Sequence, residues 1–223
     1  MSAMNPSADP HAGQPPLVDG VPLHQAAYAL VLVHGRGGSA DGMLPIARAA
    51  GASDAALIAP RAAGGTWYPK RFLDPMASNE PFLTSALASV HREVSNVVAA
   101  GIPSNQIVLV GFSQGACLSL EYAARHATRF GGIAALAGAL IGDDIDERHD
   151  KGNFAGTPIL LACGDTDSHI PEPRVRASAA TLAAHGAVID LRIYPGIEHT
   201  VVGDQIDALR AMINLVRGRA STE

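Results

Sequence analysis

The stretch that decides the expected fold is QIVLVGFSQG, residues 106–115. Its apolar first half predicts a buried strand over Gln106–Gly111, and the Ala- and Leu-rich residues that follow predict a helix over Gly115–Phe130. The pentapeptide GFSQG between them has the G-x-S-x-G pattern of a sharp turn from strand to helix. Its glycines leave room for that turn, because a Cβ at either position would strike the neighbouring strand or helix. The alternative is an ordinary turn serine that caps the helix.

Similar apolar runs recur along the chain and alternate with helical patterns. Continuous apolar runs of about four to eight residues suit strands that are buried on both faces of a parallel sheet. The alternation therefore predicts an α/β fold with a mostly parallel central sheet and helices on both faces. The other predicted strands are Tyr28–Val33, Ala55–Ala59, Gly132–Ala137, Pro158–Cys163 and Val188–Tyr194. Helical patterns cover Glu80–Ala100, Arg174–His185 and Asp204–Arg217, and Leu17–Leu23 fits either an edge strand or a loop.

The composition fits one globular domain. The chain has 223 residues, of which 48% are hydrophobic and 17% are charged, and this is enough apolar material for one sizeable core. Residues 1–16, MSAMNPSADPHAGQPP, have neither the basic nor the apolar region of a secretion signal and predict a flexible leader. A single domain is therefore expected over residues 17–223.

Charge and cysteine content exclude several kinds of partner. The net charge is −5 and basic runs are missing, which argues against nucleic acid and against an anionic membrane surface as partners. No apolar stretch approaches the ~20 residues of a membrane-spanning helix. Cys117 and Cys163 form no zinc or CxxC pattern, so a cytoplasmic location is expected. The histidines are scattered and form no HExxH motif, so no metal site is predicted.

Ser113 is the candidate nucleophile. In open α/β sheets the chemistry gathers at the carboxyl ends of the strands, where this serine is expected to lie. The turn exposes its hydroxyl at a helix N-terminus, whose positive end stabilises negative charge. Because a serine alcohol needs a base near neutral pH, a histidine must be found. His199 follows the strand Val188–Tyr194 through a short loop and is the candidate base.

A third residue must orient the imidazole and stabilise its protonated form. The segment after the strand Pro158–Cys163 supplies two candidates, Asp165 and Asp167. Asp165 is nearer to the strand end, which also fits a side chain that braces the turn. We favour Asp167 as the acid. The chain order serine, aspartate, histidine is the order expected of an α/β-hydrolase arrangement.

Acyl transfer also needs donors for the negative charge that develops on the carbonyl oxygen. The serine turn supplies the backbone N–H of Gln114. A second donor is expected from HGRGGS, residues 34–39, whose small residues let the backbone approach a ligand, and the backbone N–H of Arg36 is the candidate. The alternative is a flexible turn without ligand contact. A phosphate-binding loop is excluded because no Gly-Lys-Ser/Thr follows.

The loop Gly64–Phe72 holds the only tryptophan and a local concentration of aromatic residues. It follows the predicted strand Ala55–Ala59, so Trp67 and Tyr68 are candidate substrate-binding residues. The alternative is a small core that pins the loop. His169 is a third candidate for substrate contact, and it is also the main rival of His199 as the base.

Four motifs in this order and spacing resemble the phospholipase/carboxylesterase family of α/β-hydrolases, which includes small bacterial carboxylesterases and acyl-protein thioesterases. They are HGRGGS, GFSQG, CGDTDSHIP and YPGIEHT, and the likeness covers roughly Pro22–Val216. The resemblance implies hydrolysis of carboxylic esters, thioesters or lysophospholipids, no cofactor, and often a homodimer. By the resemblance the nucleophile, acid, base and two oxyanion donors are Ser113, Asp167, His199, Arg36 and Gln114.

Three positions depart from the pattern of that family. Position 36 is often Leu in the thioesterase branch and is Arg here, which predicts either a preference for anionic substrates or a side chain that points to solvent. Cys163 stands where His is usual, and we interpret it as a buried strand-end residue. His169 lies in Ser-His-Ile-Pro, where Pro-Val-Val-Pro is common in the family.

The sequence therefore predicts a serine carboxylesterase that acts on small-molecule esters through an acyl-enzyme intermediate. Only about 20 residues separate Ala137 from Pro158, so no lid domain is expected, and an open site favours short- to medium-chain esters. The alternatives are a thioesterase or lysophospholipase, or a lactone (dienelactone-type) hydrolase in which Arg36 receives a carboxylate. A non-catalytic binding protein would carry a broken triad, and the sequence has no such break.

Overall fold

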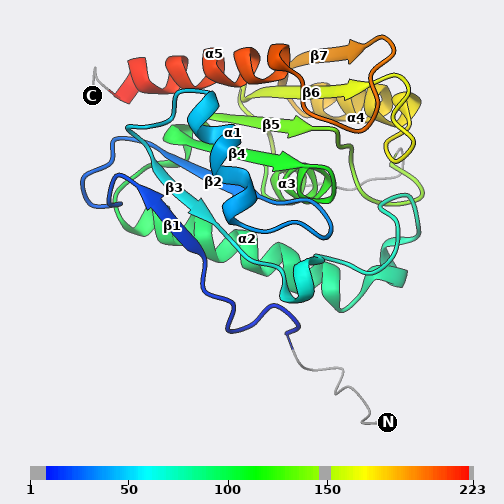
Figure 1. Cartoon of the computed structure of the whole chain (residues 1–223), viewed down its shortest axis with the longest axis horizontal. Coiled ribbons are helices and arrows are strands. Elements are labelled where there is room, and N and C mark those ends of the chain that lie inside the picture. The colour runs from blue at the N-terminus through cyan, green and yellow to red at the C-terminus, as the bar shows by residue number, and fades with distance from the viewer. Residues whose placement is uncertain (1–8, 146–151, 221–223) are drawn as a thin grey trace.

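A mixed β-sheet forms the centre of the molecule (Figure 1). The computed structural model describes residues 9–145 and 152–220, and within them the sheet has seven strands in the order β1-β3-β2-β4-β5-β6-β7. Neighbouring strands pair in parallel, except that β1 runs antiparallel to β3 at one edge. The strands are β1 (Leu17–Gly20), β2 (Ala29–Val33), β3 (Ala56–Ala59), β4 (Ile107–Phe112), β5 (Gly132–Leu136), β6 (Pro158–Gly164) and β7 (Val188–Tyr194).

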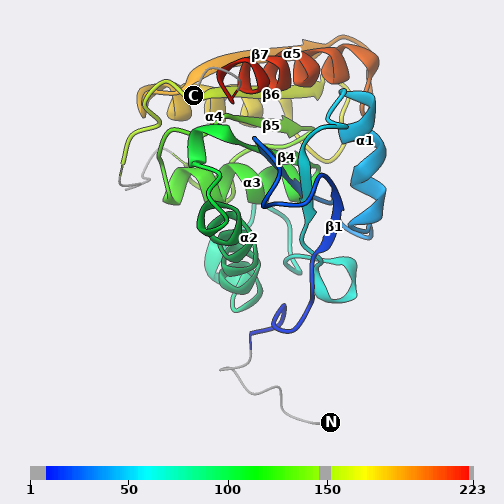
Figure 2. The same cartoon turned by 90° about the vertical axis from the view of Figure 1, so that its left-hand side faces the viewer.

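Helices cover both faces of this sheet. One face packs against α1 and α5 and the other against α2, α3 and α4 (Figure 2). The helices are α1 (Leu44–Ala49), α2 (Phe82–Ala99), α3 (Gln114–Arg125), α4 (Glu172–Ala184) and α5 (Gly203–Ala220). Short 3-10 turns lie at Asp41–Met43, Ala63–Gly65, Met76–Asn79 and Ser104–Gln106.

The predicted α/β-hydrolase class is confirmed, and most differences concern the ends of elements. Leu17–Leu23, which fitted a strand or a loop, contains the short edge strand β1. The sequence patterns missed α1, because six residues are too few for a helical period to stand out. The helix after the serine turn ends at Arg125 rather than at Phe130, and the N–H of Phe130 donates instead to the hydroxyl of Thr157.

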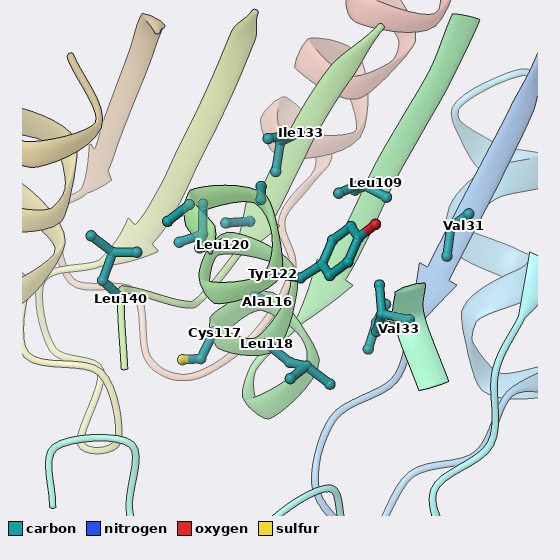
Figure 3. Packing of buried hydrophobic residues seen from close by; sticks show 14 of the residues in the cluster. Val31, Val33, Leu109, Ala116, Cys117, Leu118, Leu120, Tyr122, Ile133 and Leu140 are labelled. Atoms are coloured by element: carbon teal, nitrogen blue, oxygen red, sulfur yellow. The ribbon is translucent and has the colours of Figure 1, made fainter. Parts of the chain in front are cut away.

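The central strands are apolar along their whole length because both of their faces are covered. In β2 all five residues are buried, and alternate side chains enter the two cores. Leu30 packs towards α1 and α5, whereas Val31 packs towards α2 and α3. Figure 3 shows the core on the side of α2, α3 and α4, where Leu120 and Tyr122 of α3 lie over the sheet. With both faces filled, polar side chains are left to the loops at the strand ends.

The expected flexible leader, residues 1–16, can be compared with the structure only over residues 9–16. Residues 1–8 lie outside the described residues, so the prediction stands untested there. Near His11 it is wrong, because this side chain is fully buried. Its Nε2 donates to the carbonyl oxygen of Trp67 at 2.8 Å, and its Nδ1 accepts the N–H of Ala63 at 3.0 Å. An imidazole held at both nitrogens fixes this segment on the domain.

Two other expectations can be compared with the structure only in part. The stretch that was expected to hold no lid includes residues 146–151, which lie outside the described residues, so this point stays a prediction. Within residues 9–145 and 152–220, no helix is both long and apolar enough to cross a membrane.

Candidate active site

Ser113 lies on a strained turn between β4 and α3. Its φ of 54° and ψ of −121° fall in a region that residues other than glycine rarely adopt. A Cβ on Gly111 would lie 2.4 Å from the carbonyl oxygen of Gly115, and a Cβ on Gly115 would lie 2.1 Å from that of Val33. Only glycine fits at these two positions. The turn therefore holds Ser113 at the carboxyl edge of the sheet.

Three side chains from separate loops meet at this turn. Oγ of Ser113 lies 2.8 Å from Nε2 of His199, and Nδ1 of the same ring lies 2.7 Å from Oδ2 of Asp167. The serine follows β4, the aspartate follows β6 and the histidine follows β7, so all three lie at carboxyl ends of parallel strands. In this arrangement the imidazole can accept the hydroxyl proton while the carboxylate holds the opposite ring nitrogen protonated.

The carboxylate of Asp167 is buried and well supplied with donors. Its Oδ1 accepts the backbone N–H groups of His169 at 2.8 Å and Ile170 at 2.9 Å. Its Oδ2 faces His199 and lies 3.5 Å from the thiol of Cys163. Burial alone would raise the pKa of Asp167, but the hydrogen bonds from His199, Ile170 and His169 outweigh it and hold that pKa below its ordinary value. The group is therefore ionised near neutral pH.

The residues weighed against this acid and base have other contacts. Oδ1 of Asp165 accepts the N–H of Gly196 at 2.7 Å and so braces the loop that leads to His199. The ring of His169 meets that of His199 edge-on, with 4.8 Å between the centroids. In the described part of the chain, no hydrogen bond joins His169 to Ser113. Cys163 is fully buried at the end of β6, as predicted.

The loop after β2, with the sequence HGRGGS, lies against the serine turn. Gly35 permits this approach, because a Cβ there would come within 3.3 Å of the side chain of Ser113. His34 anchors the loop: its Nδ1 donates to the carbonyl of Gly35 and its Nε2 accepts the N–H of Ala62. Burial lowers the pKa of His34, so the ring is neutral and both of its nitrogens are used.

The two candidate oxyanion donors belong to this loop and to the serine turn. Within the described residues, neither the backbone N–H of Arg36 nor that of Gln114 donates to a protein acceptor. Buried backbone donors are nearly always paired, so an unpaired N–H beside a cavity is open to a ligand oxygen. The backbone groups are thus available for the role that the sequence predicts.

The side chain of Gln114 ties the serine turn to the loop 64–72. Its Oε1 accepts the N–H of Trp67 at 2.9 Å, and its Nε2 donates to the carbonyl of Tyr68 at 2.8 Å. The amide is buried, so both bonds are shielded from water. Sequence reasoning gave this residue a role through its backbone only.

The guanidinium of Arg36 forms hydrogen bonds with the same loop. It uses three N–H donors, and all of its acceptors are backbone carbonyls. This contact differs from the solvent-directed side chain that was one of the two expectations for position 36. The acceptors are the carbonyl oxygens of Tyr68 at 3.0 Å, Pro69 at 3.0 Å and Lys70 at 2.6 Å.

The side chain of Trp67 does not line the cavity next to Ser113, so the structure gives no support to its predicted contact with substrate. The side chain is fully buried, and its Nε1 donates to the carbonyl of His34 at 2.8 Å. The centroid of its ring lies 4.9 Å from the ring centroid of His34 and 5.5 Å from that of His11. These contacts match the alternative, a small core that pins the loop.

A cavity of about 580 Å³ opens beside Ser113. Tyr68 and His169 line it, as the sequence predicts for substrate-binding residues. Sequence reasoning missed other lining residues, although each is a sequence neighbour of a predicted site residue or loop. They are the apolar Phe72, Phe112 and Ile170 and the basic Lys70 and Arg71.

Cys117 also lines the cavity, but its chemistry differs from that of the serine. Burial raises the pKa of this thiol to about 12, so it is protonated and a poor nucleophile. The hydroxyl of Tyr68 is likewise buried, and its pKa is well above the ordinary value. In the described ranges, no group of three or more His, Cys, Asp or Glu side chains is placed to hold a metal ion.

Comparison with known sequences finds a family model that covers most of the chain. Residues 21–217 match the family model described as Phospholipase/Carboxylesterase. An acyl-protein thioesterase 1 of Saccharomyces cerevisiae is 30% identical over 153 residues, 66% of each chain. A probable carboxylesterase of Oryza sativa subsp. japonica is 30% identical over 144 residues, 62% of this chain and 54% of the relative. The chain thus aligns with about half to two thirds of the length of these curated relatives.

Solved structures extend the likeness over almost the whole chain. A phospholipase/carboxylesterase from Dyadobacter fermentans superposes with a TM-score of 0.87 at 40% sequence identity, covering 91% of this chain and 97% of that one. The Bacillus cereus carboxylesterase superposes with a TM-score of 0.71 at 17% identity, covering 92% and 95%. The second likeness shows the fold alone.

Proposed function

The chain belongs to the phospholipase/carboxylesterase family, and from this premise we propose that it is a serine hydrolase of carboxylic esters or thioesters. The observation that carries the proposal is the hydrogen-bonded series Ser113, His199 and Asp167 on a strained turn beside a cavity. Strain of this kind is stored where a side chain must be presented to a ligand.

In the proposed reaction Oγ of Ser113 attacks the acyl carbonyl carbon while Nε2 of His199 takes its proton. The carbonyl oxygen becomes an oxyanion and receives the backbone N–H groups of Arg36 and Gln114. His199 then protonates the leaving alcohol or thiol, and the acyl group remains on the serine. Water, deprotonated by the same imidazole, releases the acid and restores the serine. Asp167 stays ionised and stabilises the imidazolium throughout.

The size of the cavity supports short- to medium-chain acyl groups as substrates. Its volume of about 580 Å³ lies in the range of small-molecule sites. Phe72, Phe112 and Ile170 give it apolar wall surface for an acyl chain. We expect kcat/KM to rise with acyl length and then to level off below about ten carbons, because longer chains extend beyond the walls.

A thioester substrate is the second candidate, because curated relatives include acyl-protein thioesterases. The proposed chemistry serves either leaving group. Comparing kcat/KM for an oxygen ester and a thioester of the same acyl group separates the two. A homodimer and a cytoplasmic location remain proposals that rest on the family resemblance and the cysteine pattern.

Labelling with a fluorophosphonate probe tests the proposed nucleophile. We expect the probe to modify the wild type and to leave the Ser113→Ala variant unlabelled. Ser95 offers a matched control, because its hydroxyl also faces a histidine, with 3.5 Å to Nε2 of His91, but it lies on an exposed helix surface. Ser95→Ala should label like the wild type. Labelling that persists in Ser113→Ala, or ester hydrolysis that survives this change, would contradict the proposal.

A further inference from the structure

Three basic residues gather at the mouth of the catalytic cavity. Arg36, Lys70 and Arg71 line it, together with one carboxylate, that of Asp74. Three cations against one carboxylate leave two positive charges at this rim. The whole chain carries a net charge of −5, so the rim has the opposite sign to the protein. Such a local charge attracts anions to the cavity.

The charge of Arg36 is fixed in place but is not neutralised. Its guanidinium donates to three backbone carbonyls of residues 68–70, which are polar but carry no net charge. An arginine has five N–H donors, so two remain for a ligand. Because the loop already orders this side chain, a ligand would bind it without the usual entropic cost of fixing an arginine.

Lys70 and Arg71 add positive charge that no carboxylate of the described residues neutralises. In residues 9–145 and 152–220, no carboxylate lies within ion-pair distance of Arg36, Lys70 or Arg71. Asp74 accepts the backbone N–H of Arg71 at 2.9 Å and so faces the loop backbone. Basic residues elsewhere in the chain, such as Arg48, Arg92 and Arg125, do have carboxylate partners.

We propose that the natural substrate is an ester or thioester that carries an anionic group, such as a carboxylate, which Arg36, Lys70 and Arg71 receive at the cavity mouth. This inference rests on the proposed hydrolase function and names its substrate class. The ester carbonyl lies at Ser113 while the anionic group reaches the rim. Recognition by exposed cations acts mainly through KM and is screened by salt.

A matched pair of esters tests the proposal. Monoethyl glutarate and ethyl pentanoate have acyl chains of equal length and differ in the terminal carboxylate. Hydrolysis is followed by titration of the released acid at pH 7.5. At an ionic strength of about 10 mM we expect kcat/KM to be roughly fivefold or more higher for monoethyl glutarate, and this preference should collapse near 1 M salt.

Variants assign the preference to the rim. Lys70→Gln/Arg71→Gln removes two charges without breaking any side-chain hydrogen bond among the described residues, and it should lower the ratio of the two kcat/KM values severalfold. Arg36→Lys and Arg36→Met both lose the grip on three carbonyls, but only the lysine keeps the charge, so the ratio should persist in the first and fall in the second. Arg129→Gln is the control, because Arg129 precedes β5 at the opposite end of the sheet and should not move the ratio.

The outcomes separate this inference from the function on which it rests. An enzyme that hydrolyses ethyl pentanoate as efficiently as monoethyl glutarate at low salt overturns the anionic substrate and leaves the esterase proposal standing. A ratio that falls equally in Arg36→Lys and Arg36→Met assigns the effect to loop structure and also overturns it. A protein that hydrolyses neither ester and escapes the fluorophosphonate probe contradicts both proposals.

Discussion

The imidazole of His11 donates to the carbonyl oxygen of Trp67 at 2.8 Å, although the two residues lie 56 positions apart. The second ring nitrogen accepts the N–H of Ala63, so the neutral ring satisfies both backbone groups. Protonation of Nδ1 would break that second bond. The N-terminal segment therefore helps to hold the loop that carries the tryptophan.

Replacing this side chain should reduce stability in a pH-dependent way. His11→Ala leaves two backbone groups without partners and is expected to cost about 1–3 kcal/mol of unfolding free energy at pH 8. Burial lowers the pKa of His11 in the folded chain, so below about pH 6.5 the unfolded chain binds more protons and the wild type loses stability as pH falls. The gap between wild type and variant should narrow from pH 7 to pH 5 in urea titrations. A constant or widening gap would be inconsistent with the buried neutral ring.

The serine turn should tolerate no side chain at Gly115. An alanine Cβ there would lie 2.1 Å from the carbonyl oxygen of Val33, so Gly115→Ala is expected to destabilise the protein by about 3 kcal/mol or more, or to prevent folding. Gly218→Ala is the control, because in the described residues no atom outside the neighbouring turns of α5 lies within 4 Å of the added methyl. That change should stabilise the fold by up to about 1 kcal/mol. Thermal melts of the two variants against wild type decide the point.

Asp167→Asn should lower kcat by about 10³-fold or more, because an amide no longer holds the imidazole in the tautomer that accepts the serine proton. Steady-state hydrolysis of 4-nitrophenyl butyrate measures this loss. Asp165→Asn serves as the control, since an amide oxygen still accepts the N–H of Gly196, and we expect less than about tenfold loss there. If the two variants lose equal activity, the assignment of the acid to Asp167 is wrong.

Gln114→Ala should loosen the loop 64–72 while keeping the backbone N–H of residue 114. Losing two buried hydrogen bonds is expected to lower kcat/KM by roughly tenfold or more. Trp67 is the only tryptophan, so its fluorescence reports on this loop directly, and a red shift is expected as water reaches the ring. Ser119 lies on the same helix, and its hydroxyl donates to the carbonyl of Gly115 in that helix. Ser119→Ala should therefore leave the emission unchanged. An unshifted spectrum in Gln114→Ala would show that the amide does not hold the loop.

The sequence predicts the central part of this fold well because local pattern and final burial coincide there. The runs Tyr28–Val33 and Gly132–Ala137 match β2 and β5 to within one residue, since strands covered on both faces must be continuously apolar. The six residues of α1 left no period to read. β1 stayed ambiguous because a four-residue edge strand has one face exposed to water.

The candidate site divides in a similar way. Ser113, Asp167 and His199 can be proposed from the sequence because each follows a strand and carries a functional group that the proposed chemistry requires. The grip of Arg36 on the loop and the place of Trp67 were not predictable, since they depend on carbonyl groups some 30 residues away in the chain. Every residue has a backbone carbonyl, whatever its side chain, so a contact to a backbone acceptor produces no recognisable sequence motif.

The way Arg36 and Gln114 hold the loop has a consequence for protein engineering. Both side chains bind the main chain of residues 67–70, not its side chains. Substitutions at positions 69 and 70 that keep the backbone conformation therefore leave these hydrogen bonds intact. Replacing Pro69 also removes the fixed φ of proline at that position. The side chains at positions 69 and 70 can therefore be exchanged to change substrate selectivity at the cavity mouth, while the serine turn keeps its geometry.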